Sequence, residues 1–302
     1  MKVRIGFGLG VRTPLHDARF GAFVDDLERL GFDSLWLSER IGGDAPDPVT
    51  AIAFGAGRTT RLKFGMSVLV LPGRNPVVLA KELATIDQLS GGRLLPAFGL
   101  GVADPHEQQA FGVQRSERAA IFDESLAVLR AAWAPGTLTH HGERFHYDAL
   151  RVLPKPVQQP IDVWLGGIAE SELRRVGRLG DGWLASFVTP VDVQRGRRIV
   201  ESVAAEHDRN IDPEHYGVLV PYTLSDAVPN ALLAGLRKRR PDLTDPTEIV
   251  GVGWEATRAL VRRFVDVGFS KFVVIPLDEP ANGDDWSAHL AEAAEALLPL
   301  QT

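Results

Sequence analysis

Short apolar runs alternate along the chain with longer stretches in which apolar residues recur at helical spacing. The short runs are rich in β-branched residues and almost entirely apolar, which is typical of parallel strands covered on both faces. These predicted strands are residues 3–9, 34–37, 62–69, 94–98, 161–165, 182–185, 217–223 and 271–276. The stretches between them predict helices, for example at 20–30, 76–89 and 117–133. Eight strands with helices between them predict a closed (β/α)₈ barrel or a long doubly wound sheet.

Two stretches interrupt this alternation. Residues 137–156 combine alternating residues with turn formers and predict an inserted hairpin. Residues 225–253 are polar, contain prolines and carry one short helical pattern at 231–236. Neither has the composition of a linker, and we expect both insertions to wall the active site at the C-terminal face of the barrel. The expectation is therefore one α/β domain over residues 1–302.

The composition excludes several kinds of site and partner. The chain has no cysteine, which excludes disulfides, thiolate catalysis and cysteine-bound zinc, and its eight histidines lack metal-ligand spacing. Its net charge of −6 argues against nucleic acid, and the basic run at 237–240 is interpreted as a solvated helix end. No apolar run has the length of a membrane span, and the first residues do not resemble a signal peptide. We expect a cytoplasmic enzyme without metal or membrane contact.

The second predicted strand ends in polar and charged residues. Ser38, Glu39 and Arg40 follow it directly. Charged residues just beyond a barrel strand point into the active-site mouth, so Glu39 is a candidate general acid or base and Arg40 a candidate anion ligand. An ion pair that closes a loop explains the same residues equally well.

Glycines mark the ends of three further strands. In the third strand, a glycine and Ser67 indicate a bulge or a close backbone approach to a ligand, although a plain kink is the simpler account. Gly99 and Gly101 follow the fourth strand and on their own indicate a turn, not the GxGxxG motif. Gly166 and Gly167 lead from the fifth strand into a helix, which suits a phosphate and a plain turn equally.

Segments spread over nearly the whole chain share a family pattern. The most specific is ATIDQLSGGR at 84–93, and the others lie at 30–36, 74–76, 99–101, 166–167, 180–183 and 268–274. In this order they resemble the luciferase-like monooxygenase superfamily, and more narrowly its branch that depends on coenzyme F420. The resemblance implies a barrel with insertions, commonly a homodimer, with the cofactor across the C-terminal mouth.

The resemblance also implies roles for the strand ends. It implies a non-prolyl cis peptide behind the deazaflavin ring, for which Ser67–Val68 is the matching bond, and a phosphate-binding turn at 166–170. Glu39 is the candidate catalytic residue. The expected cofactor contacts are Ser38, Met66, Ser67, Val68, Gly101, Val102, Asp104, Gly166, Gly167, Ile168, Ala169 and Glu170.

One position departs from the family pattern. Relatives that oxidise sugar phosphates or alcohols have a histidine after the acidic residue at the end of the second strand, where this chain has Arg40. A guanidinium stays protonated, and a carboxylate beside it is a weaker base than usual. We therefore expect a reductase that transfers hydride from F420 to a small organic substrate. Two alternatives stay open: an FMN-dependent monooxygenase supplied by a separate reductase, and a flavin- or deazaflavin-binding barrel without turnover.

Overall fold

The apolar runs of the chain form one curled parallel sheet in the computed structural model, which describes residues 1–15, 17–278, 280 and 285–302. Its order is β4-β6-β9-β10-β11-β13-β1-β2-β3-β5. The strands of this path are β1 (Arg4–Leu9), β2 (Ser34–Leu37), β3 (Lys63–Met66), β4 (Leu69–Val70), β5 (Leu94–Leu95), β6 (Ala97–Gly99), β9 (Trp164–Gly166), β10 (Gly182–Ala185), β11 (Tyr216–Thr223) and β13 (Lys271–Pro276).

Interruptions in two barrel strands make the sheet look open although it closes. β3 and β4 are consecutive pieces of the third predicted strand, and β5 and β6 are pieces of the fourth. β3 pairs with β5 and β4 pairs with β6, so the third barrel strand lies beside the fourth and the sheet closes. The fourth strand breaks at Pro96, which has no N–H to donate. Among the described residues this gives eight barrel strands, and the prediction of a (β/α)₈ barrel is confirmed.

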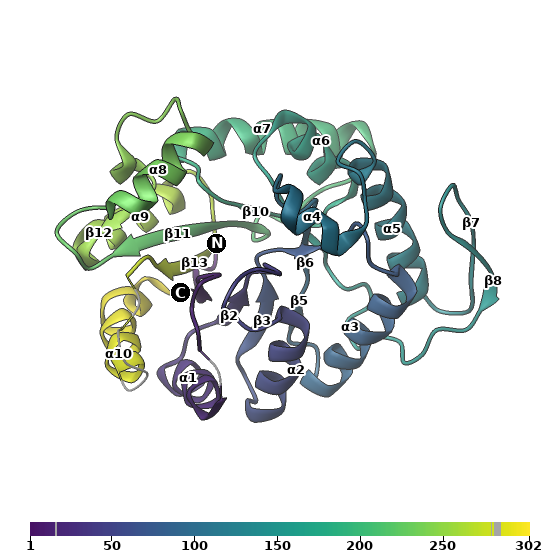
Figure 1. Cartoon of the computed structure of the whole chain (residues 1–302), viewed down its shortest axis with the longest axis horizontal. Helices are drawn as coiled ribbons and strands as arrows, with labels where there is room; N and C mark the ends of the chain where they lie inside the picture. The colour runs from purple at the N-terminus through teal and green to yellow at the C-terminus, as the bar shows by residue number, and fades with distance from the viewer. Residues whose placement is uncertain (16, 279, 281–284) are drawn as a thin grey trace.

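Helices surround the barrel, and Figure 1 shows them as an outer layer around the strands. The helices that follow successive strands are α1 (Asp17–Leu30), α2 (Pro48–Arg58), α3 (Pro76–Ser90), α5 (Arg118–Trp133), α6 (Glu170–Leu179), α7 (Pro190–Glu206), α9 (Gly253–Asp266) and α10 (Asp285–Leu297), with η2 (Leu298–Leu300) at the end. Local sequence fixes their ends. Asn75 accepts hydrogen bonds from the N–H groups of Val77 and Val78 at the start of α3, and Gly91 ends that helix at φ 68°.

The two insertions lie at different faces of the barrel. Residues 225–253 follow β11 and form α8 (Asn230–Arg239), η1 (Pro246–Glu248) and β12 (Gly251–Val252) above the C-terminal ends of the strands. The other insertion is the expected antiparallel hairpin, β7 (Leu138–His141) and β8 (His146–Leu150), which projects beside α5 in Figure 1. It follows a helix and precedes a strand, so it lies at the N-terminal face. The expectation that it walls the active site is therefore wrong.

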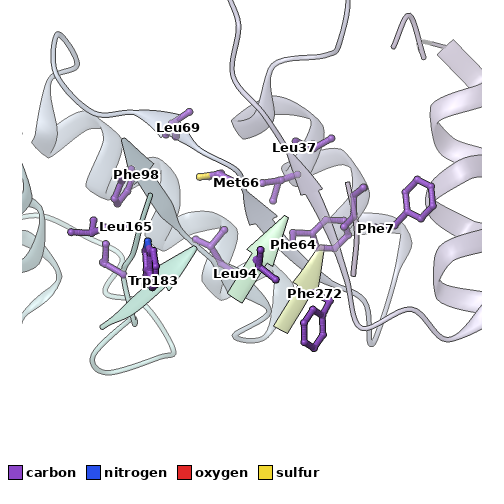
Figure 2. Packing of buried hydrophobic residues seen from close by; sticks show 14 of the residues in the cluster. Phe7, Leu37, Phe64, Met66, Leu69, Leu94, Phe98, Leu165, Trp183 and Phe272 are labelled. Atoms are coloured by element: carbon purple, nitrogen blue, oxygen red, sulfur yellow. The ribbon is translucent and has the colours of Figure 1, made fainter. Parts of the chain in front are cut away.

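Side chains fill the barrel interior from the N-terminal ends of its strands to the C-terminal mouth. At the bottom, the carboxylate of Asp33 pairs with Lys63 and Lys271, with 3.0 Å between each nitrogen and its oxygen. Above it, the rings of Trp36 and Trp164 pack edge to face, with centroids 6.4 Å apart. Between the sheet and the helices lies a second apolar layer, part of which Figure 2 shows around Phe64, Phe98 and Phe272. The interior is thus solid below the C-terminal mouth.

Candidate functional site

A cavity of about 750 Å³ opens at the C-terminal ends of the barrel strands. Pockets of roughly 300–1,000 Å³ are typical of small-molecule and cofactor sites. Of the predicted site residues, the cavity wall contains Ser38, Glu39, Ser67, Val68, Gly101, Val102, Gly166 and Gly167. The fold therefore brings together residues from four strand ends that are far apart in the sequence.

The third strand carries a bulge into this cavity. The Ser67–Val68 peptide bond is cis, which confirms the prediction, and both residues line the cavity. The end of β2 supports the bulge: the Ser38 hydroxyl donates a 3.0 Å hydrogen bond to the Ser67 carbonyl, and the Ser67 N–H donates to the carbonyl of Leu37 at 2.8 Å. Ser38 thus positions the bulge from the neighbouring strand.

Glycines form the wall beside this bulge, where a larger residue would crowd the Val68 side chain. A Cβ at Gly99 would lie 2.5 Å from Cγ2 of Val68, and one at Gly166 would lie 3.2 Å from its Cγ1. Gly101 has a φ of +80°, a conformation that side chains rarely adopt. The Val68 side chain therefore packs directly on the backbone of two neighbouring strands.

Arg118 holds the turn after β6 and was not found from the sequence. Its Nη1 donates hydrogen bonds to the carbonyls of Leu100, Gly101 and Val102 at 3.1, 3.0 and 3.1 Å. The side chain comes from the start of α5, and no motif in the sequence links it to this turn. Asp104, a predicted cofactor contact, lies outside the cavity wall and caps α4 (Pro105–Phe111) by accepting from the His106 N–H.

The turn between β9 and α6 is the predicted phosphate site. Gly167 has a φ of +114°, and the N–H groups of Ile168 and Ala169 point to one place, as expected of a helix start. That place is taken by a side chain of the same helix: Oε2 of Glu172 accepts from both N–H groups at 3.0 Å. Glu172 lines the cavity, whereas Ile168, Ala169 and Glu170 do not. Its position three residues into the helix is the capping-box position, a signal that the sequence contained.

Glu39 lies buried at the mouth with both oxygens engaged. Oε2 accepts a 2.7 Å hydrogen bond from the Val70 N–H, and Oε1 pairs with the guanidinium of Arg74. Burial raises the pKa of Glu39, and the Arg74 charge and the Val70 N–H offset this only in part. The expected weakening of this base by Arg40 is therefore wrong: the ion-pair partner is Arg74, and the net shift is upward.

Met66, the last predicted cofactor contact, and the basic run at 237–240 do not lie where the sequence predicted. Met66 is fully buried in the core, so its side chain does not reach the cavity. The run 237–240 is only partly a solvated helix end. Arg237, Lys238 and Arg239 are all exposed, but Arg239 also lines the cavity, and Arg240 is buried between Asp192 and Asp242.

The sequence of the chain matches a known family. The model of the luciferase-like monooxygenase family matches residues 4–268, and the chain belongs to this family of oxidoreductases. Among curated relatives, an F420-dependent glucose-6-phosphate dehydrogenase of Kineococcus radiotolerans is 26% identical, and the match covers 92% of this chain and 91% of that protein.

Solved structures show the same fold at lower identity. An F420-dependent secondary alcohol dehydrogenase in complex with an F420-acetone adduct has a TM-score of 0.81 and 18% identity over 100% of both chains. The oxygenating constituent of 3,6-diketocamphane monooxygenase from Pseudomonas putida, in complex with FMN, has a TM-score of 0.79 and 18% identity over 99% of this chain and 98% of that chain. Within the described part of this chain, no helix is long and apolar enough to cross a bilayer, and no group of three metal-ligating side chains occurs.

Proposed function

We propose that the chain is an F420-dependent oxidoreductase that works as a reductase on a small organic substrate. The family membership supports the redox chemistry, and a relative matched over more than nine-tenths of both chains is named as F420-dependent.

The residues of the cavity fit a flat ring with an anionic tail. Val68, between β3 and β4, offers an apolar surface to the cavity, and the glycines at 99 and 166 let its side chain lie flat against the neighbouring backbone. The N–H groups at the start of α6 suit the tail phosphate in place of the Glu172 carboxylate. When bound and reduced, F420 supplies a hydride, and the walls keep water from it.

The carboxylates that line the cavity support reduction as the direction of reaction, because none of them is free to act as a base. Among the described residues, the cavity is lined by no histidine and by three carboxylates, Glu39, Glu107 and Glu172. Each of these already accepts hydrogen bonds from backbone N–H groups. Oxidation of an alcohol requires a group that takes the hydroxyl proton. Burial raises the pKa of Glu39, but both of its oxygens are engaged, one by the Val70 N–H and the other by Arg74, so it is not free to take that proton. Reduction of an electron-poor double bond or carbonyl needs a proton donor in place of a base, and solvent or a donor group on the substrate would supply that proton.

Paired assays in both directions test this function. We expect the purified chain to oxidise reduced F420 with enones or imines, and to leave oxidised F420 unchanged with glucose 6-phosphate or simple secondary alcohols. Glu39→Gln is the matched variant. Robust alcohol oxidation that is abolished by this substitution makes Glu39 the base and contradicts the proposed direction.

FMN is the second candidate cofactor. A structure of the same fold is in complex with FMN, and a ring and a phosphate are common to both cofactors. A monooxygenase of this kind would receive reduced FMN from a separate reductase. Tight cofactor binding without turnover in any assay would instead indicate a carrier.

A further inference from the structure

Two arginines face the cavity from the side opposite the phosphate turn. Arg40 follows β2, and Arg239 lies at the end of α8, in the insertion after β11. The strands between β11 and β2 are β13 and β1, which lie across the barrel from β9. Arg12, in the loop after β1, lines the same side. Two other arginines, Arg118 and Arg175, line the cavity near the phosphate turn. Arg118 is bonded to the carbonyls of residues 100–102, and Arg175 pairs with Asp123. The two ends of the cavity thus differ in whether their arginines are already engaged.

Neither Arg40 nor Arg239 is neutralised. Nη1 of Arg40 is buried and has no hydrogen-bond partner among the described residues. No carboxylate in the described part of the chain forms an ion pair with Arg40 or Arg239. The acidic side chains of the cavity wall are engaged elsewhere: Glu39 pairs with Arg74, and Glu107 and Glu172 accept from backbone N–H groups. An unpaired buried donor is costly unless a ligand satisfies it.

The two charges also act on each other. Burial, together with the nearby charge of Arg40, lowers the pKa of Arg239. The Arg239 guanidinium stacks on Phe187, with Cζ 4.6 Å from the ring centroid, so it is held at the cavity rim. Two like charges held close together create a positive field that an anion relieves.

We propose that Arg40 and Arg239 form an anion-binding subsite that holds a carboxylate or phosphate group of the substrate. The planar forks of guanidinium groups match these two groups in geometry. That the anion belongs to the substrate rests on the proposed function and on the position of the subsite across the barrel from the phosphate turn. The subsite places an anionic substrate between the arginines and the bulge at Ser67–Val68. The substrate class is thus an organic acid or phosphate ester that carries the reducible bond.

The test compares charged and neutral probes of similar shape. Phenyl phosphate, benzoate and benzyl alcohol are titrated by calorimetry into the full chain, with and without F420. The variants are Arg40→Gln, Arg239→Gln and the double variant. Arg237→Gln is the control, because it removes the same charge from an exposed position of the same helix. Melting temperatures show whether each variant is folded, and Arg239→Lys serves as a milder second variant.

The wild-type chain is expected to bind phenyl phosphate at least about tenfold more tightly than benzyl alcohol, and each single substitution to weaken phenyl phosphate about tenfold. Arg237→Gln should leave this affinity unchanged, and all variants should bind F420 as the wild type does. Equal binding of phenyl phosphate by the folded double variant and the wild type overturns the subsite. Loss of F420 affinity with unchanged probe affinity assigns the arginines to the cofactor tail and overturns the substrate assignment. If F420 fails to bind but the probe binds through both arginines, the subsite stands and the proposed function falls.

Discussion

The backbone N–H of Val70 donates a 2.7 Å hydrogen bond to Oε2 of Glu39, which ties the end of β2 to the strand segment beyond the bulge. Together with the Arg74 pair on the other oxygen, this contact makes Glu39 part of the wall that supports the bulge. The same residue is therefore a positioning group and a titrating group, and the two roles are separable by pH.

The stability of Glu39→Gln relative to the wild type should rise with pH. The pKa of Glu39 is raised above 4.5, so its contribution to stability is fully present below that pH and is lost as the pH rises through the folded-state pKa. Glutamine does not titrate and loses nothing. Urea unfolding of both proteins between about pH 4 and 7 measures the difference. If the unfolding free energy of the wild type increases relative to that of the variant as the pH rises, the pKa of Glu39 is not raised.

Substitution of Glu172 should strengthen phosphate and cofactor binding. Its carboxylate occupies the two N–H groups that the phosphate needs, so both Glu172→Gln and Glu172→Ala reduce the competition. We expect affinity for inorganic phosphate and F420 to rise by about fivefold. Glu170→Gln is the control, because it removes the same charge from the same helix end without freeing an N–H group. Equal affinities in the Glu172 and Glu170 variants would place the phosphate elsewhere.

Gly167→Val should weaken cofactor binding. A Cβ at this position would lie 2.6 Å from Oε2 of Glu172, and the φ of +114° disfavours any side chain. The valine side chain would stand in the approach of the phosphate to the N–H groups, and the strained φ would distort the turn, so F420 affinity should fall about tenfold. Gly57→Ala, at a helix position with open space around it, is the control. A folded Gly167→Val protein with unchanged affinity would show that the turn does not hold the cofactor.

Asp33→Asn should destabilise the barrel without changing the cavity. Burial alone would raise the pKa of Asp33, but Lys271 and Lys63 outweigh it and lower the pKa to about 2. The resulting stability is present above pH 3.8 and is lost as the pH falls through about 2. The substitution leaves Lys271 buried without a carboxylate, which costs about 3–5 kcal/mol of unfolding free energy.

Two measurements check this. Denaturant unfolding should show the loss for Asp33→Asn, whereas Asp25→Asn, which breaks the more exposed pair with Arg58, should cost far less, because solvent screens that pair. F420 affinity below the melting transition should match the wild type. A loss of less than about 1 kcal/mol for Asp33→Asn would mean that Lys271 finds another partner.

The sequence predicted the features that depend on neighbouring residues, namely the strands and the turns at their ends. Each predicted strand run overlaps a barrel strand, although the third and fourth strands are interrupted and the fifth begins only at Trp164, and the family pattern placed the cis peptide at Ser67–Val68. Contacts between distant segments were not predictable in this way. Arg74 lies 35 residues from Glu39 and replaced Arg40 as its partner. Arg239 reaches the cavity only because the insertion after β11 folds over the mouth, which no local pattern encodes.

The most direct test of this account is a titration of the purified chain with F420 and with FMN, followed by quenching of cofactor fluorescence. The account predicts that F420 binds at least about tenfold more tightly than FMN, a difference of about 1.4 kcal/mol in binding free energy. FMN binding at least about tenfold more tightly than F420 would contradict the proposed cofactor, while leaving membership of the luciferase-like family intact.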